Sequence, residues 1–375
     1  MRFLHTGDLH LDSSFAGEGV FGAESRREAQ RRTLRAVFDT AKAQECQMIL
    51  IAGDLFDGRY VTPETASLCL RLFKEAGCPV ILSPGNHDPY AEGSFYREAT
   101  LPDNVFLFTS NELQRFDFEE LGARVYGYAF TSPVLSESPL TGEEAAAEDG
   151  MLRLLCAHGE LNAPLSRYAP LLESDLERMG FDYCALGHIH NPDAEQTKEK
   201  IRYCGFPEGR SYDEIGDGQV LIVDVERGEA PVIRPISVSE NRYLREELEV
   251  TGAADAEELG LKIRRFAEEL GTRKGTHLRL SLVGYADPEV IGEVMAKEET
   301  LGEGLGELSL RDLTVPFADG EYLERDTTLR GAFYRALYPR LVHEDPKIRR
   351  LAVRALQIGL SAIDGRKIPE EERGE

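Results

Sequence analysis

Histidine, aspartate and asparagine residues recur in five short motifs, each directly after an apolar run of the chain. The motifs are Asp8-Leu9-His10, Gly53-Asp54, Gly85-Asn86-His87-Asp88, His158 and Gly187-His188-Ile189-His190. Carboxylate, amide and imidazole groups together suit borderline divalent metals such as Mn, Fe, Zn or Co better than Ca. The motifs therefore predict a metal site.

Each motif stands at the predicted end of a β-strand. Apolar strands are expected at residues 1–6, 48–52, 80–83, 152–157 and 183–186. Side chains at strand ends of an α/β fold converge on one edge of the sheet. Residues two apart point to the same side of a strand, so His10 is expected beside Asp8, and His188 beside His190. Three glycines are expected to let the backbone turn sharply there, namely Gly53, Gly85 and Gly187.

The number of potential ligands indicates two ions rather than one. Two carboxylates, one amide oxygen and four imidazoles are too many for one tetrahedral ion: Asp8, Asp54, Asn86, His10, His158, His188 and His190. Two ions that share a bridging carboxylate fit this set better, and such sites hydrolyse phosphoesters. A further imidazole, His87, lies next to the set. For the histidines outside the motifs, a structural role is expected: His5, His277 and His343.

The chain of 375 residues is long enough for two or three domains. Helices expected at 24–44 and 63–76 alternate with the first strands, which favours an α/β layer with parallel pairing. A second module is expected from about residue 237, with strands at 245–251, 277–282 and 308–315 and helices at 255–270 and 288–299. Two tail helices are expected after it, at 328–341 and 346–363. The predicted domains are therefore residues 1–236, 237–326 and 327–375.

The order D-x-H, G-D, G-N-H-D, H and G-H-x-H resembles that of the calcineurin-like metallophosphoesterases, over roughly the first 235 residues. The flanks HTGDLHLD, GDLFD and SPGNHD are similar to the DNA repair exonuclease branch, meaning the nuclease subunit of the SbcCD complex and its relatives. The pairing of DLHLDS with GFPEGR at 205–210 is most similar to the YhaO-type subgroup.

This resemblance implies an α/β fold: a four-layer α/β/β/α sandwich of two mixed sheets, with a smaller C-terminal α+β capping domain and a helical tail. It also implies the assignment of ligands. One ion would be held by Asp8, His10, Asp54 and His190, and the other by Asp54, Asn86, His158 and His188, with Asp54 as the bridge. His87 would protonate or stabilise the leaving 3′-oxygen, and Asp88 would orient its ring. Mn²⁺ is the favoured metal, with Mg²⁺, Fe and Zn left open.

The implied activity is that of a metal-dependent DNA exonuclease or endonuclease in DNA repair. The implied partners are DNA ends, an ATPase of the structural-maintenance (SMC) type and a second copy of the chain. The sequence leaves several roles open. Arg210 could contact a substrate phosphate or form a structural salt bridge, and Asp12 and Asp57 could support ligand histidines or be solvated. The apolar tail helices could pack on the capping domain or dock the ATPase.

The amino-acid composition and net charge exclude several classes of protein and limit the expected affinity for DNA. With 42% apolar and 29% charged residues, the chain is not disordered, collagen-like or a disulfide scaffold. Its net charge of −24 predicts weak unaided affinity for DNA, because a phosphate backbone attracts basic surfaces. We expect no signal peptide and no membrane span, and the six cysteines fit free thiols in the cytoplasm.

Two other functions compete with the nuclease. A small-molecule phosphodiesterase or nucleotide hydrolase could use the same fold and metal site, and the acidic charge favours it. A catalytically silent scaffold is the third candidate, and the complete ligand set argues against it.

Overall fold

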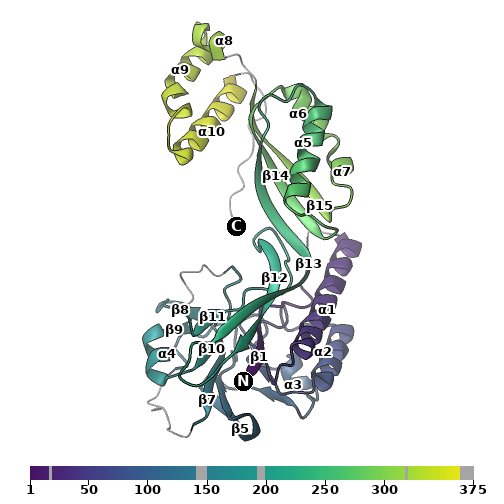
Figure 1. Cartoon of the computed structure of the whole chain (residues 1–375), viewed down its shortest axis with the longest axis vertical. Coiled ribbons are helices and arrows are strands. Elements are labelled where there is room, and N and C mark those ends of the chain that lie inside the picture. Colours follow the sequence, from purple (N-terminus) through teal and green to yellow (C-terminus); the bar gives the residue numbers. More distant parts are fainter. Residues whose placement is uncertain (17–18, 141–149, 192–198, 317–319, 364–375) are drawn as a thin grey trace. The chain divides into compact units, whose positions relative to one another are not determined.

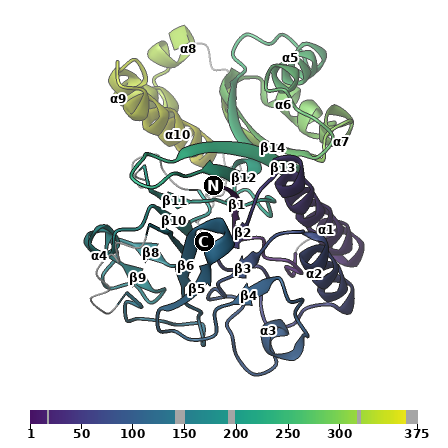
Figure 2. The same cartoon turned by 60° about the horizontal axis from the view of Figure 1, so that its bottom comes forward.

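The computed structural model describes residues 1–16, 19–140, 150–191, 199–316 and 320–363. The chain divides into two compact units, Met1–Arg242 and Tyr243–Glu375, whose elements are drawn in Figures 1 and 2. One long strand, β13 (Val232–Glu249), runs from the first unit into the second. The predicted domain boundaries after residues 236 and 326 stay predictions. No helix in the described ranges has the length and hydropathy needed to cross a membrane.

The first unit contains a mixed sheet with the strand order β13-β12-β1-β2-β3-β4. Its other strands are β1 (Arg2–Thr6), β2 (Ile49–Ile51), β3 (Val80–Leu82), β4 (Val105–Leu107) and β12 (Gly216–Asp224). The strands β1 to β4 are parallel to one another, and β12 is antiparallel to β1. Continuous apolar runs such as Ile49–Ile51 form these strands because both faces of the sheet are covered.

A second mixed sheet has the strand order β11-β10-β7-β6-β5. Its strands are β5 (Gln114–Phe118), β6 (Ala123–Gly127), β7 (Leu152–His158), β10 (Tyr183–Gly187) and β11 (Ile201–Tyr203). Only the β5–β6 pair is antiparallel among the described strands of this sheet. Two short strands, β8 (Glu160–Leu161) and β9 (Pro170–Leu171), pair separately.

The apolar clusters define four layers in the first unit. Phe3 and Leu50 of the first sheet pack against Leu154 of the second sheet. On the outer face of the first sheet lie α1 (Gly19–Ala43) and α2 (Pro63–Glu75), side by side in both views. On the outer face of the second sheet lies α4 (Glu173–Met179). The predicted α/β/β/α sandwich is confirmed.

Several helices and strands were not predicted from the sequence, because each is short or lacks a clear apolar pattern. The strand β5 mixes polar and apolar residues, and the helices α3 (Phe95–Glu98), η1 (Glu119–Leu121) and α4 are short. The strand β13 starts at Val232 rather than at the predicted residue 245; its first half is mostly exposed or half-buried and contains Pro235, a residue that sequence patterns do not favour inside a strand.

In the second unit, β14 (Thr276–Ala286) and β15 (Glu307–Pro316) are parallel and lie in the order β13-β14-β15. The helices α5 (Ala256–Glu269), α6 (Pro288–Met295) and α7 (Glu298–Leu301) belong to this part, and α5 packs its apolar face on the sheet. The helix predicted at 288–299 is therefore two helices. Three more helices follow: α8 (Gly320–Arg325), α9 (Leu329–Leu341) and α10 (Pro346–Ile363).

The tail helices have a small core of their own. Leu356 and Leu360 of α10 are fully buried against Leu323 and Tyr334. Leu351 on the same helix is 73% exposed. Packing of α10 within the second unit thus buries one of its apolar faces and leaves Leu351 exposed on another.

Candidate metal centre

The loops that follow β1 and β2 run side by side and bring three predicted ligands together. The amide of Asp8 donates to the carbonyl of Gly53 (3.0 Å), and that of His10 donates to the carbonyl of Asp54 (2.9 Å). Parallel pairing therefore continues past the strand ends. This explains why Asp8, His10 and Asp54 meet at the carboxyl edge of the sheet, where ligands bind in α/β folds.

Four of the predicted ligands have a left-handed backbone, which side chains other than glycine rarely adopt. Their φ angles are 51° at Asp8, 46° at His10, 47° at Asp54 and 105° at His188. Each such residue costs on the order of 1–3 kcal/mol, and such residues cluster at functional sites. The surrounding fold holds these four side chains in place despite this cost.

The three motif glycines serve two different purposes. Gly53 has φ +88°, which confirms the predicted sharp turn. Gly85 and Gly187 do not have positive φ, so the turn argument is wrong for them. A Cβ at Gly85 would overlap the carboxylate of Asp54, and a Cβ at Gly187 would overlap the carbonyl of Ala52. These two positions need glycine because other groups approach the backbone closely.

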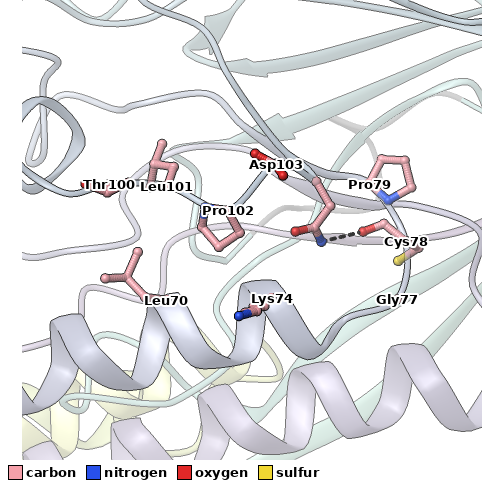
Figure 3. A pocket seen from close by; sticks show the side chains of 10 residues that line it. Leu70, Lys74, Gly77, Cys78, Pro79, Thr100, Leu101, Pro102 and Asp103 are labelled. Atoms are coloured by element: carbon pink, nitrogen blue, oxygen red, sulfur yellow. Dashed lines mark hydrogen bonds between the residues drawn. The ribbon is translucent and has the colours of Figure 1, made fainter.

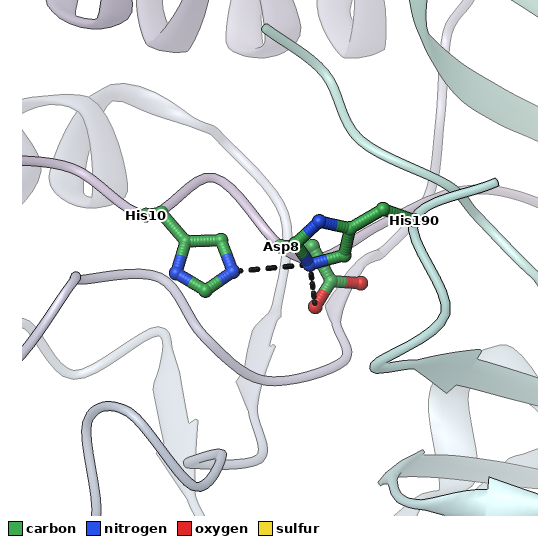
Figure 4. Close-up of side chains that lie close together, drawn as sticks. All are labelled: Asp8, His10 and His190. Atoms are coloured by element: carbon green, nitrogen blue, oxygen red, sulfur yellow. Dashed lines mark hydrogen bonds and ion pairs between the residues drawn. The ribbon is translucent and has the colours of Figure 1, made fainter. Parts of the chain in front are cut away.

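One half of the ligand cluster joins His10, His190 and Asp8 (Figure 4). Nε2 of His10 lies 3.2 Å from Nε2 of His190 and 3.7 Å from Oδ2 of Asp54. Nε2 of His190 lies 3.6 Å from Oδ1 of Asp8. Two imidazole nitrogens and two carboxylates therefore point at one small space.

The other half of the cluster centres on His158. Its Nε2 lies 3.3 Å from Oδ2 of Asp54 and 2.9 Å from Oδ1 of Asn86. The ring of His188 lies 5.1 Å from that of His158 between centroids, and its backbone amide donates to Asp8 (2.9 Å). The His188 ring therefore lies near the cluster. Among the described residues, three groups have ligand atoms that all lie within 4.8 Å of one another, and His188 belongs to none of them: Asp8/His10/His190, His10/Asp54/His87 and Asp8/Asp54/His158.

The donor set fits divalent cations. Asp8 and Asp54 are 1% and 2% exposed, so their negative charges need compensation inside the protein. Burial opposes the charged form of His158, but Asp54 and Asp8 outweigh it and raise its pKa to about 9. Burial likewise opposes protonation of His190, while Asp8 and Glu214 raise its pKa to about 10. The carboxylates that attract these protons also supply the negative charge and the oxygen donors that a divalent cation binds.

His87 lies at the exposed side of this cluster, with 47% of its side chain accessible. Its Nδ1 is 3.0 Å from Oδ1 of Asp57, and this hydrogen bond is the main cause of the raised pKa of His87. The same Asp57 oxygen lies 3.3 Å from Nδ1 of His10. Asp57 is therefore the carboxylate that orients both rings, which is one of the two roles that the sequence left open for it.

Asp88 does not make the contact predicted for it. Its carboxylate accepts hydrogen bonds from the amides of Gly85 (2.8 Å) and Phe56 (3.0 Å) and from the hydroxyl of Tyr96 (2.6 Å), not from the ring of His87. Burial and the charge of Asp54 raise the pKa of Asp88 to about 7. Asp88 thus holds the motif loop, and the orientation of His87 falls to Asp57.

Arg210 and Glu214 form a pair beside His190. Nη2 of Arg210 lies 2.6 Å and Nε 2.9 Å from Oε1 of Glu214, which is the structural salt bridge considered above. Nη1 of Arg210 lies 3.9 Å from Asp57. Glu214 also lies 2.8 Å from Nδ1 of His190, a contact that the sequence did not reveal, because Glu214 follows no strand end and belongs to no motif.

The remaining acidic neighbour of the motifs has a structural role. Asp12 accepts hydrogen bonds from the amide of Thr62 (2.7 Å) and the hydroxyl of Thr65 (2.8 Å) and thereby secures the start of α2. It bonds no ligand histidine.

A pocket of about 690 Å³ lies at the opposite, amino ends of β3 and β4 (Figure 3). Pro79 and Asn104 precede these strands, and Asn104 donates to the carbonyl of Cys78 (2.9 Å). None of the predicted site residues lines this pocket. The chemistry-bearing residues therefore gather at the carboxyl edge.

The sequence of this chain is similar to those of several known proteins. The chain is 29% identical over 243 residues to the uncharacterized metallophosphoesterase YhaO of Bacillus subtilis (strain 168), covering 61% of this chain and 58% of that protein. It is 29% identical over 268 residues to the DNA double-strand break repair protein Mre11 of Aeropyrum pernix, covering 66% and 64%. It is 26% identical over 288 residues to the SbcD subunit of the SbcCD nuclease of Escherichia coli (strain K12), covering 64% and 70%.

The first two of these matches span 58% and 64% of the relatives' own length, less than two thirds of each. The model of the calcineurin-like phosphoesterase family matches residues 1–192, which hold all of the predicted metal ligands. The cluster of carboxylates and imidazoles at the strand ends thus lies within the matched region, and the chain belongs to the calcineurin-like phosphoesterases, a family of metal-dependent hydrolases.

Proposed function

We propose that this protein is a two-metal phosphodiester hydrolase that cleaves DNA in repair, as exonuclease and endonuclease. One observation carries the proposal: carboxylate, amide and imidazole groups from five separate strand ends, most of them buried, point at one another at 2.9–3.7 Å between ligand atoms. Two divalent ions held there would supply Lewis acids for the phosphoryl group and an acidified water as nucleophile. Mn²⁺ is the proposed metal.

The ligands are proposed as two overlapping sets. Asp8, His10, Asp54 and His190 hold one ion, and Asp54, Asn86, His158 and His188 hold the other. Asp54 is suited to bridge, since its Oδ2 faces both His10 (3.7 Å) and His158 (3.3 Å).

His87 is the proposed general acid for the leaving 3′-oxygen. It is the most exposed imidazole of the cluster, its Nδ1 is held by Asp57, and its backbone amide donates to Asp54 (2.9 Å). With Nδ1 bonded to Asp57, Nε2 is the ring atom that would donate to the substrate oxygen. Arg210, whose side chain is 20% exposed beside this site, is proposed to contact a substrate phosphate.

Two features support DNA as substrate and an ATPase as partner, and the net charge limits how DNA can bind. Two of the similar proteins are named as a DNA double-strand break repair protein and a nuclease subunit of a complex. The net charge of −24 predicts weak unaided DNA binding, so that a partner, the metals or a dimer cleft must supply affinity. The exposed Leu351 on α10 offers apolar surface for an SMC-type ATPase. We propose a homodimer that acts in the cytoplasm.

The decisive experiment supplies purified protein with Mn²⁺ and four substrates: labelled single-stranded DNA, double-stranded DNA, bis-p-nitrophenyl phosphate and cyclic nucleotides. We expect cleavage of DNA and of the aryl diester, and loss of both with Asp54→Ala. The matched control is Asp255→Ala, which removes an N-cap of α5 outside the site and should leave cleavage unchanged. Cleavage of small diesters but not of DNA, even with the partner ATPase present, would refute the nuclease.

That last outcome would support the second candidate, a small-molecule phosphodiesterase. Its favouring observation is the acidic charge, since small diesters need no basic surface. The same panel of substrates therefore decides between the two.

A further inference from the structure

The imidazoles on the two sides of the metal centre are held by different kinds of groups. His190 and His10 turn Nε2 toward the cluster and Nδ1 toward carboxylates, at 2.8 Å from Glu214 and 3.3 Å from Asp57. His158 instead turns Nδ1 toward the backbone carbonyl of Ala52 (3.0 Å), with Oδ1 of Asp8 farther away at 3.9 Å. The two proposed ion sites therefore differ in the groups that bond the outer nitrogen of their histidine ligands: carboxylates at one site and a backbone carbonyl at the other.

Glu214 is buried and fixed by hydrogen bonds in the position from which it contacts His190. Its side chain is only 4% exposed, and its Oε2 accepts the backbone amide of Arg210 (2.7 Å). Its Oε1 receives Nε and Nη2 of Arg210 in addition to Nδ1 of His190. Arg210 thus compensates the buried charge and fixes the carboxylate in position.

The geometry also sets the tautomer of His190. Nη2 of Arg210 lies 3.4 Å from Nδ1 of His190, whereas Oε1 of Glu214 lies at 2.8 Å, so the nearer partner is an acceptor. Nδ1 then keeps its hydrogen when a cation displaces the proton on Nε2, and Nε2 presents its lone pair to the ion. A carboxylate behind a ligand imidazole also makes the ring a stronger donor, and loss of such a partner typically lowers metal affinity 10–100-fold.

We propose that Glu214 is the positioning residue of His190, and that Glu214 and Asp57 together make the ion site of Asp8, His10, Asp54 and His190 the tighter of the two. A backbone carbonyl is a weaker acceptor than a carboxylate, so the site that contains His158 binds its ion more weakly. This inference rests on the proposed two-metal centre and adds that the site of Asp8, His10, Asp54 and His190 binds its ion first.

The test measures metal binding rather than cleavage. The full chain is freed of metal with a chelator and titrated with Mn²⁺ by calorimetry, and free Mn²⁺ is followed by electron paramagnetic resonance. We expect two classes of site in the native protein. His158→Asn should remove the weaker class of site and leave the tighter one. This result would identify the weaker class as the ion site that contains His158.

Glu214→Gln should weaken the tighter class 10–100-fold and leave the weaker class within threefold. Arg210→Gln tests the support of the loop: Glu214 remains behind His190 but loses the cation that fixes it, so the tighter class should weaken by less than in Glu214→Gln. Glu226→Gln, in the exposed turn after β12, is the matched carboxylate control and should change neither class.

Two results would overturn the inference. One is an unchanged tighter class in Glu214→Gln, and the other is an equal loss in Arg210→Gln, which would mean that the loop as a whole collapses. Failure of the proposed function looks different: the native protein would bind two Mn²⁺ with the predicted asymmetry and still leave DNA intact.

Discussion

At the scale of single residues, the structure reassigns the group that orients the proposed acid. Asp57 contacts Nδ1 of both His87 and His10, while Asp88 is buried among backbone amides and Tyr96. A carboxylate on Nδ1 fixes the ring and favours its charged form, as an acid for a leaving oxygen requires. The chemistry of His87 should therefore depend on Asp57.

Asp57→Asn is expected to lower kcat on bis-p-nitrophenyl phosphate about 10–100-fold at saturating Mn²⁺, because His87 loses its anionic partner. In a His87→Ala background, the same change should add little, since residues that act as one unit are not additive. The measurement is kcat for the four proteins of this cycle. Multiplicative effects would show that Asp57 acts independently of His87.

At the scale of elements, strand ends and the loops after them create the site. The loop ladder between the ends of β1 and β2 forces left-handed backbone at Asp8, His10 and Asp54. The loop after β3 then approaches so closely that Gly85 has no room for a side chain. The metal centre depends on this backbone packing as well as on its ligands.

Gly85→Ala should weaken Mn²⁺ binding at least tenfold, because the added methyl group displaces the carboxylate of Asp54. Gly292→Ala, in α6 where a Cβ meets nothing within 4 Å, is the matched control. It should leave binding unchanged and stabilise the helix by about 0.5–1 kcal/mol. Native affinity in Gly85→Ala would show that the loop can move aside without loss.

His5 joins the two sheets and should make stability depend on pH. Its ring lies fully buried between the hydroxyl of Tyr183 (3.0 Å) and the carbonyl of Leu186 (3.2 Å), and burial lowers its pKa to about 3. The folded protein therefore resists a proton that the unfolded chain accepts near pH 6.5. Stability contributed by neutral His5 is complete above pH 6.5 and is lost as pH falls toward 3.

Between pH 7.5 and 5.0, this loss should reach about 1–2 kcal/mol in the unfolding free energy. His5→Gln should lose less stability than the native protein over the same interval, by about that amount. Urea unfolding with chelator present measures the difference, because the ligand histidines then contribute equally to both proteins. The exposed His343→Gln is the control, and an identical pH dependence in His5→Gln would refute the assignment.

At the scale of the whole molecule, all of the proposed ligands belong to the first compact unit. Metal binding should therefore stabilise that unit selectively. An ion in 1,000-fold excess over its Kd adds about 4 kcal/mol.

Addition of Mn²⁺ should thus slow amide hydrogen exchange in Met1–Arg242, most strongly around the five motifs, and leave Tyr243–Glu375 unchanged. Exchange followed by mass spectrometry with and without chelator makes the comparison, and Asp54→Ala should abolish the effect. Equal protection of both units would show that they unfold as one.

The sequence by itself determined the parts of this protein that depend on local pattern. Apolar runs bounded by polar motifs gave the positions of β1, β2, β3, β7 and β10, and the motif residues at their ends meet in one cluster. This works because β1, β2 and β3 are parallel in one sheet and β7 and β10 are parallel in the other, so that the ligands gather at the carboxyl ends of each set.

Only the tertiary structure decided which groups lie behind those ligands. Glu214 reaches His190, and Asp57 rather than Asp88 reaches His87, through packing of loops that no short pattern describes. The need for glycine at Gly85 is likewise a contact with Asp54, distant in sequence. Ligand identity follows from residue type and strand position, whereas the environment of each ligand follows from which loops meet in space.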